Sequence, residues 1–341
     1  MATTTDYLNQ LKKDLTTAKT NLANLGVEVL ESDTFTEVSE KMASIQSGAD
    51  LSEYFTETIT KGTSNVAGWV NAFIKFPAIK NIDRSCSYMF SGLKCQQIDL
   101  TKIDTSNVTE MSSMFYGCSG LTSLDVSHFD TSQVTNMMDL FRNCSSIETL
   151  IGIENFDTRQ VTNMGRMFYA MQKIKTLDLS NFNTDNVTSM IEMFRGNSQM
   201  TTLNVSNFNT SKISHFNFLF GYCSSLTTLD LSSFDFTKAT QIQDMFRDCT
   251  NLTNLTFGQN LGLGYSTTQS ANYSYYSMNL SYCPNLTEAS LISVLNGLAD
   301  IASLGVQTQT CNLGSTNLAK LTSEAGQQAL AQAQSYGWTV S

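Results

Sequence analysis

The chain has 341 residues, a formal net charge of −10 at pH 7 and only 15% charged side chains. This acidic balance argues against nucleic acid and anionic membrane as partners. No stretch approaches the roughly 20 apolar residues of a membrane-spanning helix, so we expect no membrane insertion. The opening residues Met1–Leu8 lack the basic-then-apolar layout of a secretory signal. The sequence therefore predicts synthesis in a cytosol.

Residues 1–48 are predicted to form a helical segment for oligomerisation or anchoring. Leucines recur there with the alternating spacing of a coiled-coil seam, and Gly26 follows as a helix stop. A capping box at Thr34–Glu37 begins a second short helix. One interpretation is a hairpin that packs on the rest of the chain, and the sharper one is a homo-oligomer, either a dimer or a trimer. The seam residues are Leu8, Leu11, Leu15, Leu22 and Leu25.

Residues 49–84 lack the repeat that follows them and are predicted to form the N-terminal cap of a solenoid. Apolar and polar residues alternate in this segment. Trp69, Phe73 and Phe76 are available to cover an exposed end, which solenoids require in order to remain soluble.

Residues 85–283 repeat themselves about every 26 residues, which is the signature of a solenoid. Each unit is too small to bury its apolar face alone and must stack on its neighbours. The anchor of each unit is a large apolar residue followed by Phe. The seven anchors are Met89–Phe90, Met114–Phe115, Leu140–Phe141, Met167–Phe168, Met193–Phe194, Leu219–Phe220 and Met245–Phe246.

Within each unit the sequence predicts two short strands and one helical turn. In the second unit the strands are Leu121–Val126 and Val134–Met137, and Asp139–Arg142 is the turn that places Phe141 in the core. Stacking would give two narrow parallel sheets with strands about 4.8 Å apart, and a rod of about 35 Å. The fold class is therefore an α/β repeat, a solenoid of about seven coils.

Residues 284–341 are predicted to form an α/β cap at the C-terminal end. Thr287–Ala299 and Thr322–Tyr336 have the apolar spacing of helices, and Thr308–Leu313 is a candidate strand. The stretch before this cap is rich in Gly, Ser and Tyr and interrupts the repeat. Such mixtures are typical of adaptable recognition loops, although a lid over the last coil is the alternative. The candidate binding residues are Tyr265, Tyr273, Tyr275 and Tyr276.

Five of the eight Cys residues share one position, three residues after the anchor, with Leu280 replacing Phe in the last unit. Leu93, Met171 and Asn197 hold the same position in other units. A position that accepts Cys, Leu and Met is an interior ladder site in which Cys acts as a small hydrophobe. A cytosolic origin disfavours disulfides, and the spacing is unlike that of a metal-binding C-x-x-C pair. The five are Cys118, Cys144, Cys223, Cys249 and Cys283.

Two columns of acidic or amide residues recur along the repeats. A calcium ladder is one interpretation of the first column, but interchange with Asn favours side chains that close their own turns. The second column is expected on the solvent face of the first sheet, where solubility explains it better than binding does. The first column is Asp130, Asp157, Asn183, Asn209 and Asp235; the second is Asp99, Asp125, Asp178, Asn204 and Asp230.

Catalysis finds little support in the sequence. His128 and His215, the two His residues, occupy different positions of the repeat, so they suggest neither a metal pair nor a catalytic triad. Nucleophile-elbow, Walker, dinucleotide and HExxH motifs are missing. We therefore expect no enzyme, no catalytic residue, no metal and no cofactor.

The repeat frame resembles a known family. Residues 105–118, Thr-Ser-Asn-Val-Thr-Glu-Met-Ser-Ser-Met-Phe-Tyr-Gly-Cys, are similar to the BspA-type leucine-rich repeat of surface proteins from gut Firmicutes, mycoplasmas and their phages. The resemblance spans about 200 residues and implies a leucine-rich-repeat solenoid. It also implies adhesion in general terms, with a host cell-surface glycan or protein as the partner.

A second resemblance concerns the ends of the chain. Residues 22–29 and 35–45 are similar to the openings of phage tail-fibre proteins, and residues 337–340 to their ends. This resemblance implies a virion-surface protein for host attachment, docked on other virion proteins through its N-terminal helices. The alternatives are a bacterial surface adhesin or interaction scaffold, and a purely structural decoration protein of a virion.

Overall fold

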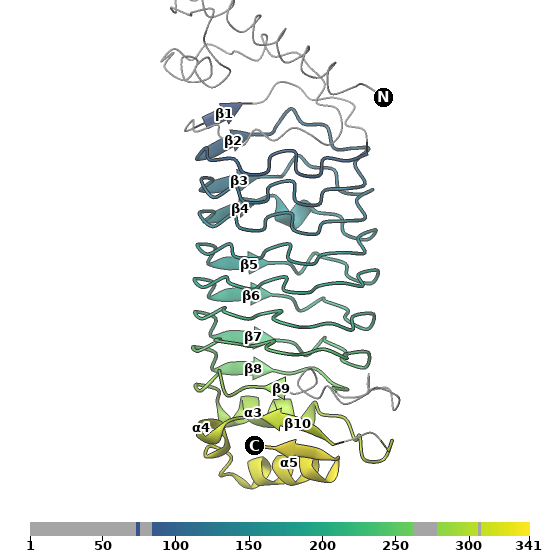
Figure 1. The fold of residues 1–341 in the computed structure, drawn as a ribbon, viewed down its shortest axis with the longest axis vertical. Helices are drawn as coiled ribbons and strands as arrows, with labels where there is room; N and C mark the ends of the chain where they lie inside the picture. Colours follow the sequence, from purple (N-terminus) through teal and green to yellow (C-terminus); the bar gives the residue numbers. More distant parts are fainter. Residues whose placement is uncertain (1–72, 76–83, 262–277, 306–307) are drawn as a thin grey trace, which may run out of the picture.

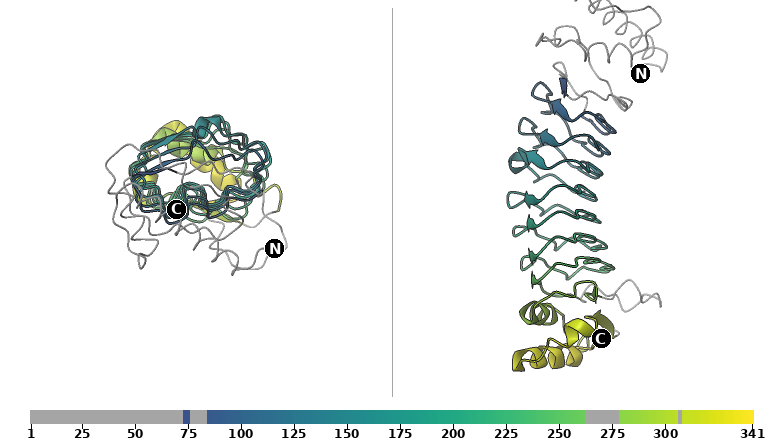
Figure 2. Two further views of the ribbon diagram at one scale, coloured as in Figure 1. Left: turned by 90° about the horizontal axis from the view of Figure 1, so that it is seen from above. Right: turned by 90° about the vertical axis from the view of Figure 1, so that its left-hand side faces the viewer.

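The computed structural model describes residues 73–75, 84–261, 278–305 and 308–341. Over these residues the chain forms an elongated rod of stacked coils, with a small unit of helices and strands at the C-terminal end (Figure 1). Viewed along the rod, the coils superpose as a flattened ring (Figure 2). Within the described part, no helix has the length and apolar character needed to span a bilayer.

Each coil contributes one short parallel strand, and the strands stack along one side of the rod (Figure 1). Ser123 lies opposite Thr149, 26 residues later, which confirms the repeat length. The middle residue of most strands is buried, as in Leu124 and Leu177, because successive side chains of a strand alternate between the core and solvent. The strands are β1 (Phe73–Lys75), β2 (Gln97–Asp99), β3 (Ser123–Asp125), β4 (Thr149–Ile151), β5 (Thr176–Asp178), β6 (Thr202–Asn204), β7 (Thr228–Asp230) and β8 (Asn254–Thr256), paired as β1–β2, β3–β4, β5–β6 and β7–β8.

The anchor Phe residues form a continuous stack through the core. Ring centroids of successive anchors are 5.5–5.9 Å apart, from Phe90 to Phe246. A second buried column of Phe lies beside the first, and Phe168 and Phe182 make one of the contacts between them at 6.5 Å. Offset aromatic pairs at such separations stabilise a fold beyond the apolar area that they bury. The predicted solenoid core is therefore confirmed.

The second predicted strand is not formed as a strand. Val134–Met137 is reduced to a single bridged residue, Asn136, which forms parallel bridges with Glu110 and Asn163 within a column of such bridges. The flanking N–H groups turn back within the coil, that of Val134 to the Thr131 carbonyl and that of Met138 to the Asn136 side chain, so the ladder does not lengthen into a sheet. The column of bridges consists of Ser85, Glu110, Asn136, Asn163 and Ser189, followed by His215 and Gln241.

The predicted helical turn at Asp139–Arg142 is also wrong. The backbone there alternates between hydrogen bonds along the rod and hydrogen bonds within the coil. Phe141 donates its N–H to the carbonyl of Met167 in the next coil, at 2.9 Å. Arg142 instead donates three residues back, to the carbonyl of Asp139, at 3.1 Å. A helix would direct every N–H back along its own coil, and would leave the coils without this ladder.

This alternation depends on two left-handed residues in each coil, placed two before and two after the anchor Phe. Only glycine adopts this conformation freely; other residues incur a cost of about 1–2 kcal/mol each. The residues before Phe are Tyr88, Ser113, Asp139, Arg166, Glu192, Phe218 and Asp244; those after it are Gly92, Gly117, Asn143, Ala170, Gly196, Tyr222 and Asp248.

Replacing Ala170 by glycine is therefore expected to stabilise the protein. Ala170 has φ of +54°. Removing its Cβ relieves the left-handed strain, which exceeds the extra chain entropy of glycine, for a gain of about 0.5–1 kcal/mol. Urea unfolding measures the change. The reverse substitution Gly196→Ala, at the same position one coil later, should cost a similar amount, and a loss of stability in Ala170→Gly would contradict the argument.

The C-terminal unit contains the helices and the strand that the sequence predicts, in slightly shorter form. Helix α4 was not predicted. The three strands of this unit form a parallel sheet in the order β11-β10-β9. The elements are β9 (Met278–Asn279), α3 (Glu288–Asn296), β10 (Gln309–Asn312), α4 (Ser315–Leu318), α5 (Glu324–Ser335) and β11 (Trp338–Val340); the short 3-10 helix η2 (Ile153–Asn155) lies earlier, in the rod.

Helix α3 ends the column of strands at β8. Its Ser290 and Ser293 hydroxyls accept the N–H groups of Leu255 and Phe257, both at 2.9 Å. The Ser290 hydroxyl also donates to the carbonyl of Thr253 at 3.0 Å. These hydroxyls satisfy backbone groups that another strand would otherwise pair with, so the edge of β8 is closed.

Candidate functional site

The binding and oligomerisation residues predicted from the sequence lie outside the described residues. This applies to the seam Leu8, Leu11, Leu15, Leu22 and Leu25, and to the loop residues Tyr265, Tyr273, Tyr275 and Tyr276. Both remain predictions.

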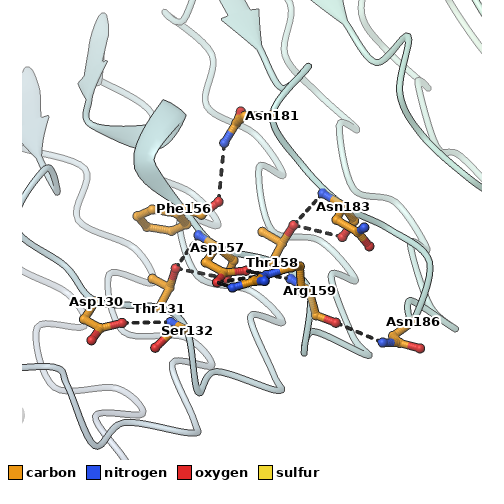
Figure 3. Close-up of polar contacts among 10 residues, drawn as sticks. All are labelled: Asp130, Thr131, Ser132, Phe156, Asp157, Thr158, Arg159, Asn181, Asn183 and Asn186. Atoms are coloured by element: carbon orange, nitrogen blue, oxygen red, sulfur yellow. Dashed lines mark hydrogen bonds and ion pairs between the residues drawn. The ribbon is translucent and has the colours of Figure 1, made fainter.

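The first acidic column closes the turns of the rod, as the interchange with Asn indicates. Asp130 accepts the N–H of Ser132 at 3.0 Å, and Asp157 that of Arg159 at 3.1 Å (Figure 3). The other members of the column, Asn183, Asn209 and Asp235, accept the N–H two residues further on in the same way. Among the described residues no group of three His, Cys, Asp or Glu side chains is arranged to hold a metal ion.

A buried column of threonines joins each of these turns to the next. The Thr158 hydroxyl donates to the Asn183 carbonyl and accepts the Asn183 N–H, both at 2.8 Å (Figure 3). Thr131 makes the same pair of bonds with Asp157. Each hydroxyl thus satisfies two backbone groups of the following coil. The column consists of Thr105, Thr131, Thr158, Thr184 and Thr210.

The second acidic column has an equally local role. Asp125 accepts the N–H of Ser127 at 2.9 Å, and Asp178 that of Ser180 at 3.0 Å. Asp99, Asn204 and Asp230 make the corresponding bond. These side chains therefore end the strands of the rod, which is a structural role.

Acid is expected to weaken the fold through these carboxylates. Hydrogen bonds from a residue two positions further on lower the pKa of three carboxyls. The donors are Ser127 to Asp125, Arg159 to Asp157 and Ser180 to Asp178. A carboxyl whose pKa is lower in the folded state stabilises the fold above its unfolded pKa, about 3.9, and loses this contribution as the pH falls through the folded value. The urea concentration at the midpoint of unfolding should decrease once the pH falls below about 4. Asp178→Asn should reduce this dependence, and equal midpoints at pH 7 and pH 3 would contradict it.

The cysteine ladder also serves the core. All eight thiols are free and buried. Cys144 donates to the Phe115 carbonyl of the preceding coil at 3.0 Å, and the Asn197 amide does the same to Phe168 at 2.9 Å. Burial raises the pKa of Cys223 to about 12, so its reactive thiolate is scarce at neutral pH.

Two open hollows adjoin each other at Asn181, one of them beside η2, and both are lined by side chains with bonds of their own. Asn181, which borders both hollows, donates to the carbonyls of Ile153 and Phe156, each at 3.4 Å (Figure 3). Asn207 donates to the Ser180 carbonyl. These hollows therefore offer few unused polar groups to a ligand.

The most distinctive surface of the rod is a row of interleaved aromatic rings and guanidinium groups, here called the Arg–Tyr stripe. Arg142 lies between the rings of Tyr116 and Tyr169, with its guanidinium carbon 5.5 and 4.8 Å from their centroids. Such cation–π contacts continue from coil to coil, the shortest being Arg195 over Phe218 at 4.2 Å. The stripe consists of Tyr116, Arg142, Tyr169, Arg195, Phe218, Tyr222, Arg247 and Tyr282.

Carboxylates from the left-handed column fix the arginines of the stripe. Asp139 bonds Arg142 at 3.2 Å, Asp244 bonds Arg247 at 3.3 Å, and Glu192 bonds Arg195. Arg166 adds a two-bond contact to Asp139, at 2.8 and 3.2 Å, which raises the pKa of the guanidinium. The stripe is therefore held in one conformation before any partner arrives.

The sequence contains a signal for this stripe at one position of the repeat, outside any motif along the chain. The residue directly after the anchor Phe alternates Tyr116, Arg142, Tyr169 and Arg195. Other outward positions of the frame are mostly Ser, Thr and Asn. This position, Arg247 included, identifies five of the eight stripe residues, whereas Phe218, Tyr222 and Tyr282 lie at other positions of the frame.

The family model for a "Mycoplasma protein of unknown function, DUF285" matches residues 84–175 and 148–260, more than half of the chain. A crystal structure of a leucine-rich repeat protein from Eubacterium ventriosum is similar at 17% identity, over 62% of this chain and 49% of that one, with a TM-score of 0.33. The chain thus spans about half the length of that protein. No curated protein matches the chain.

Proposed function

The chain belongs to the DUF285 family, and on this premise we propose that it is a non-enzymatic interaction scaffold of the adhesin type. It is displayed on a bacterial surface and binds a partner protein through the Arg–Tyr stripe. The stripe is the observation that carries the proposal, because Tyr and Arg are enriched at the centres of protein interfaces and dominate their binding energy.

The energetics of the stripe support a role in binding rather than in stability alone. Phe218 of the stripe is left-handed, and so are Arg166 and Glu192, which belong to the ion pairs beneath it. Each costs about 1–2 kcal/mol where glycine would cost almost nothing. A cation–π contact at an exposed site contributes only about 0.5–1 kcal/mol, and an exposed ion pair about as little. The free energy of these contacts does not exceed the cost of the left-handed backbone. Long side chains at these positions therefore indicate a role in binding at the surface.

The comparisons favour a bacterial protein over a virion protein. The virion prediction depends chiefly on residues 22–45, which lie outside the described residues, and the family model lends it no support. The family description assigns no activity. We therefore propose the cell surface as the location.

Binding of labelled full-length protein to intact cells tests this proposal. Flow cytometry would compare the producing bacterium, neighbouring bacteria and animal epithelial cells, with and without protease treatment of the cells. The double variant Tyr169→Ser with Arg195→Ser should bind about 30-fold more weakly, since loss of a hot spot costs about 2 kcal/mol.

The matched control alters the strand side of the rod with Thr202→Ala and Thr228→Ala, both at exposed positions. The control should bind like the parent protein, and circular dichroism should show that all variants fold. Unchanged binding by the stripe variant, or binding that survives protease treatment of the cells, would overturn the proposal.

A further inference from the structure

We infer that the partner segment lying on the Arg–Tyr stripe is an extended acidic peptide with a carboxylate at every third residue. This inference rests on the proposed function, because it names the ligand of the same surface.

Three arginines of the stripe retain unused donors. Arg142, Arg195 and Arg247 each use Nη1 to bond a carboxylate. Within the described part of the chain, Nη2 of each makes no hydrogen bond. The buried side-chain nitrogens that lack a partner there are Nε of Arg142 and Nε of Arg247. The Nη2 groups are therefore in contact with solvent and are free to bind an acceptor.

The spacing of these donors is close to the repeat of an extended chain. The three arginines occupy every second coil, and the anchor Phe rings beside them step by 5.7–5.9 Å from coil to coil, so the arginines recur after about 11.5 Å. A polyproline-II helix has three residues per turn and rises about 3.1 Å per residue, so every third side chain returns to the same face after about 9.3 Å. The flexible side chains of glutamates at every third position would span the difference of about 2 Å and meet successive arginines.

Charge and burial place the guanidinium groups outermost. The side chains of Asp139 and Asp244 are each 10% exposed, whereas those of Arg142 and Arg247 are 27% and 37% exposed. The protein's own carboxylates thus orient the arginines from below, and a carboxylate of the ligand would approach from outside. Charge-assisted bonds between Arg and a carboxylate are the strong class of hydrogen bond.

The covered ring faces favour a peptide over a glycan. The Tyr169 ring has both Arg142 and Arg195 close to it, with guanidinium carbons 4.8 and 5.7 Å from its centroid. Sugars stack on open aromatic faces, and here guanidinium groups occupy them. A peptide carboxylate, by contrast, needs no open ring face, because it binds the guanidinium groups themselves.

Fluorescence anisotropy with full-length protein tests the inference. The probe is a labelled 15-residue peptide with glutamate at every third position between proline and serine. The comparison peptide has the same composition with its glutamates in one block. We expect the spaced peptide to bind at least about tenfold more tightly, and to weaken between 50 and 300 mM NaCl as charges are screened.

Variants assign the binding to the stripe. Arg195→Gln should weaken the spaced peptide about tenfold, and the triple variant Arg142→Gln, Arg195→Gln and Arg247→Gln should abolish its binding. Arg159→Gln is the matched control, because Arg159 also pairs with a carboxylate, that of Asp157, but lies on another edge of the rod. This control should leave the affinity unchanged.

Three outcomes would overturn the inference: equal affinity for the two peptides, full affinity in the triple variant, or displacement of the spaced peptide by polygalacturonate at a lower concentration than by unlabelled peptide. The last outcome would make an acidic glycan the occupant. If the stripe variant loses cell binding while neither peptide binds, the proposed function stands and this inference fails. If the spaced peptide binds but the protein does not bind cells, the inference stands and the proposed function fails.

Discussion

Replacing Gly152 by alanine is expected to lower the free energy of unfolding by about 2–5 kcal/mol. Gly152 has φ of +86°, and an added Cβ would lie 2.2 Å from the Cα of Ser127 in the preceding coil. Left-handed strain contributes about 1–2 kcal/mol of this loss, and overpacking about 1–3 kcal/mol. Ser127 has little room to retreat, because Val126 beside it donates to the Ile151 carbonyl at 2.8 Å.

Gly305→Ala separates the two contributions. Gly305 has φ of +66°, but nothing lies within 4 Å of an added Cβ, so only the left-handed cost of about 1–2 kcal/mol applies. Urea unfolding of both variants gives the difference. Equal losses of unfolding free energy would show that the coils containing β3 and β4 separate more easily than their contacts suggest.

The consequence of Gly152→Ala should extend along the rod. In a repeat protein each coil contacts only its neighbours, so stability is a sum of coil and interface contributions. A weakened interface between β3 and β4 would uncouple the coils before it from those after it. Calorimetry should then show a broader or split transition, in which the N-terminal coils melt first.

The periodic features of the fold were predictable from the sequence, because each is repeated at a fixed position. The anchor Phe column, the Cys ladder and the turn-closing acidic column each follow from side-chain chemistry at one such position. The one-residue insertion that creates Gly152 and η2 is visible as the longer spacing from Phe129 to Phe156. The close approach of Gly152 to Ser127 is not visible in the sequence, because it depends on how two coils stack.

The backbone around the anchor was predicted wrongly for a physical reason. Short segments such as Asp139–Arg142 have helical composition, and their left-handed residues are mostly not glycine. Gly92, Gly117 and Gly196, two residues after the anchor, are the signal for that conformation. The contacts between neighbouring coils override the local helical preference, and the same override spaces the Arg–Tyr stripe at regular intervals.

Thr158→Val is expected to lower the free energy of unfolding by about 1–3 kcal/mol, although the two side chains have the same shape. Thr158 is 2% exposed, and its hydroxyl satisfies both the N–H and the carbonyl of Asn183. Valine leaves these two groups without partners, and an unsatisfied buried polar group costs about 1–3 kcal/mol. The partly exposed edge of Asn183 admits water and keeps the total within that range.

Thr188→Val is the matched control, because the exposed Thr188 hydroxyl makes a single bond, to the Thr162 carbonyl at 3.1 Å. Its loss should change stability by less than about 0.5 kcal/mol. The chain itself makes a related exchange at Phe236, which occupies the threonine position of its coil. The next coil lacks the acidic turn, and Phe236 stacks there on Phe257, with ring centroids 4.8 Å apart. The threonine column thus ends where its backbone partner ends. Equal effects of the two valine substitutions in urea unfolding would show that the column does not join the coils.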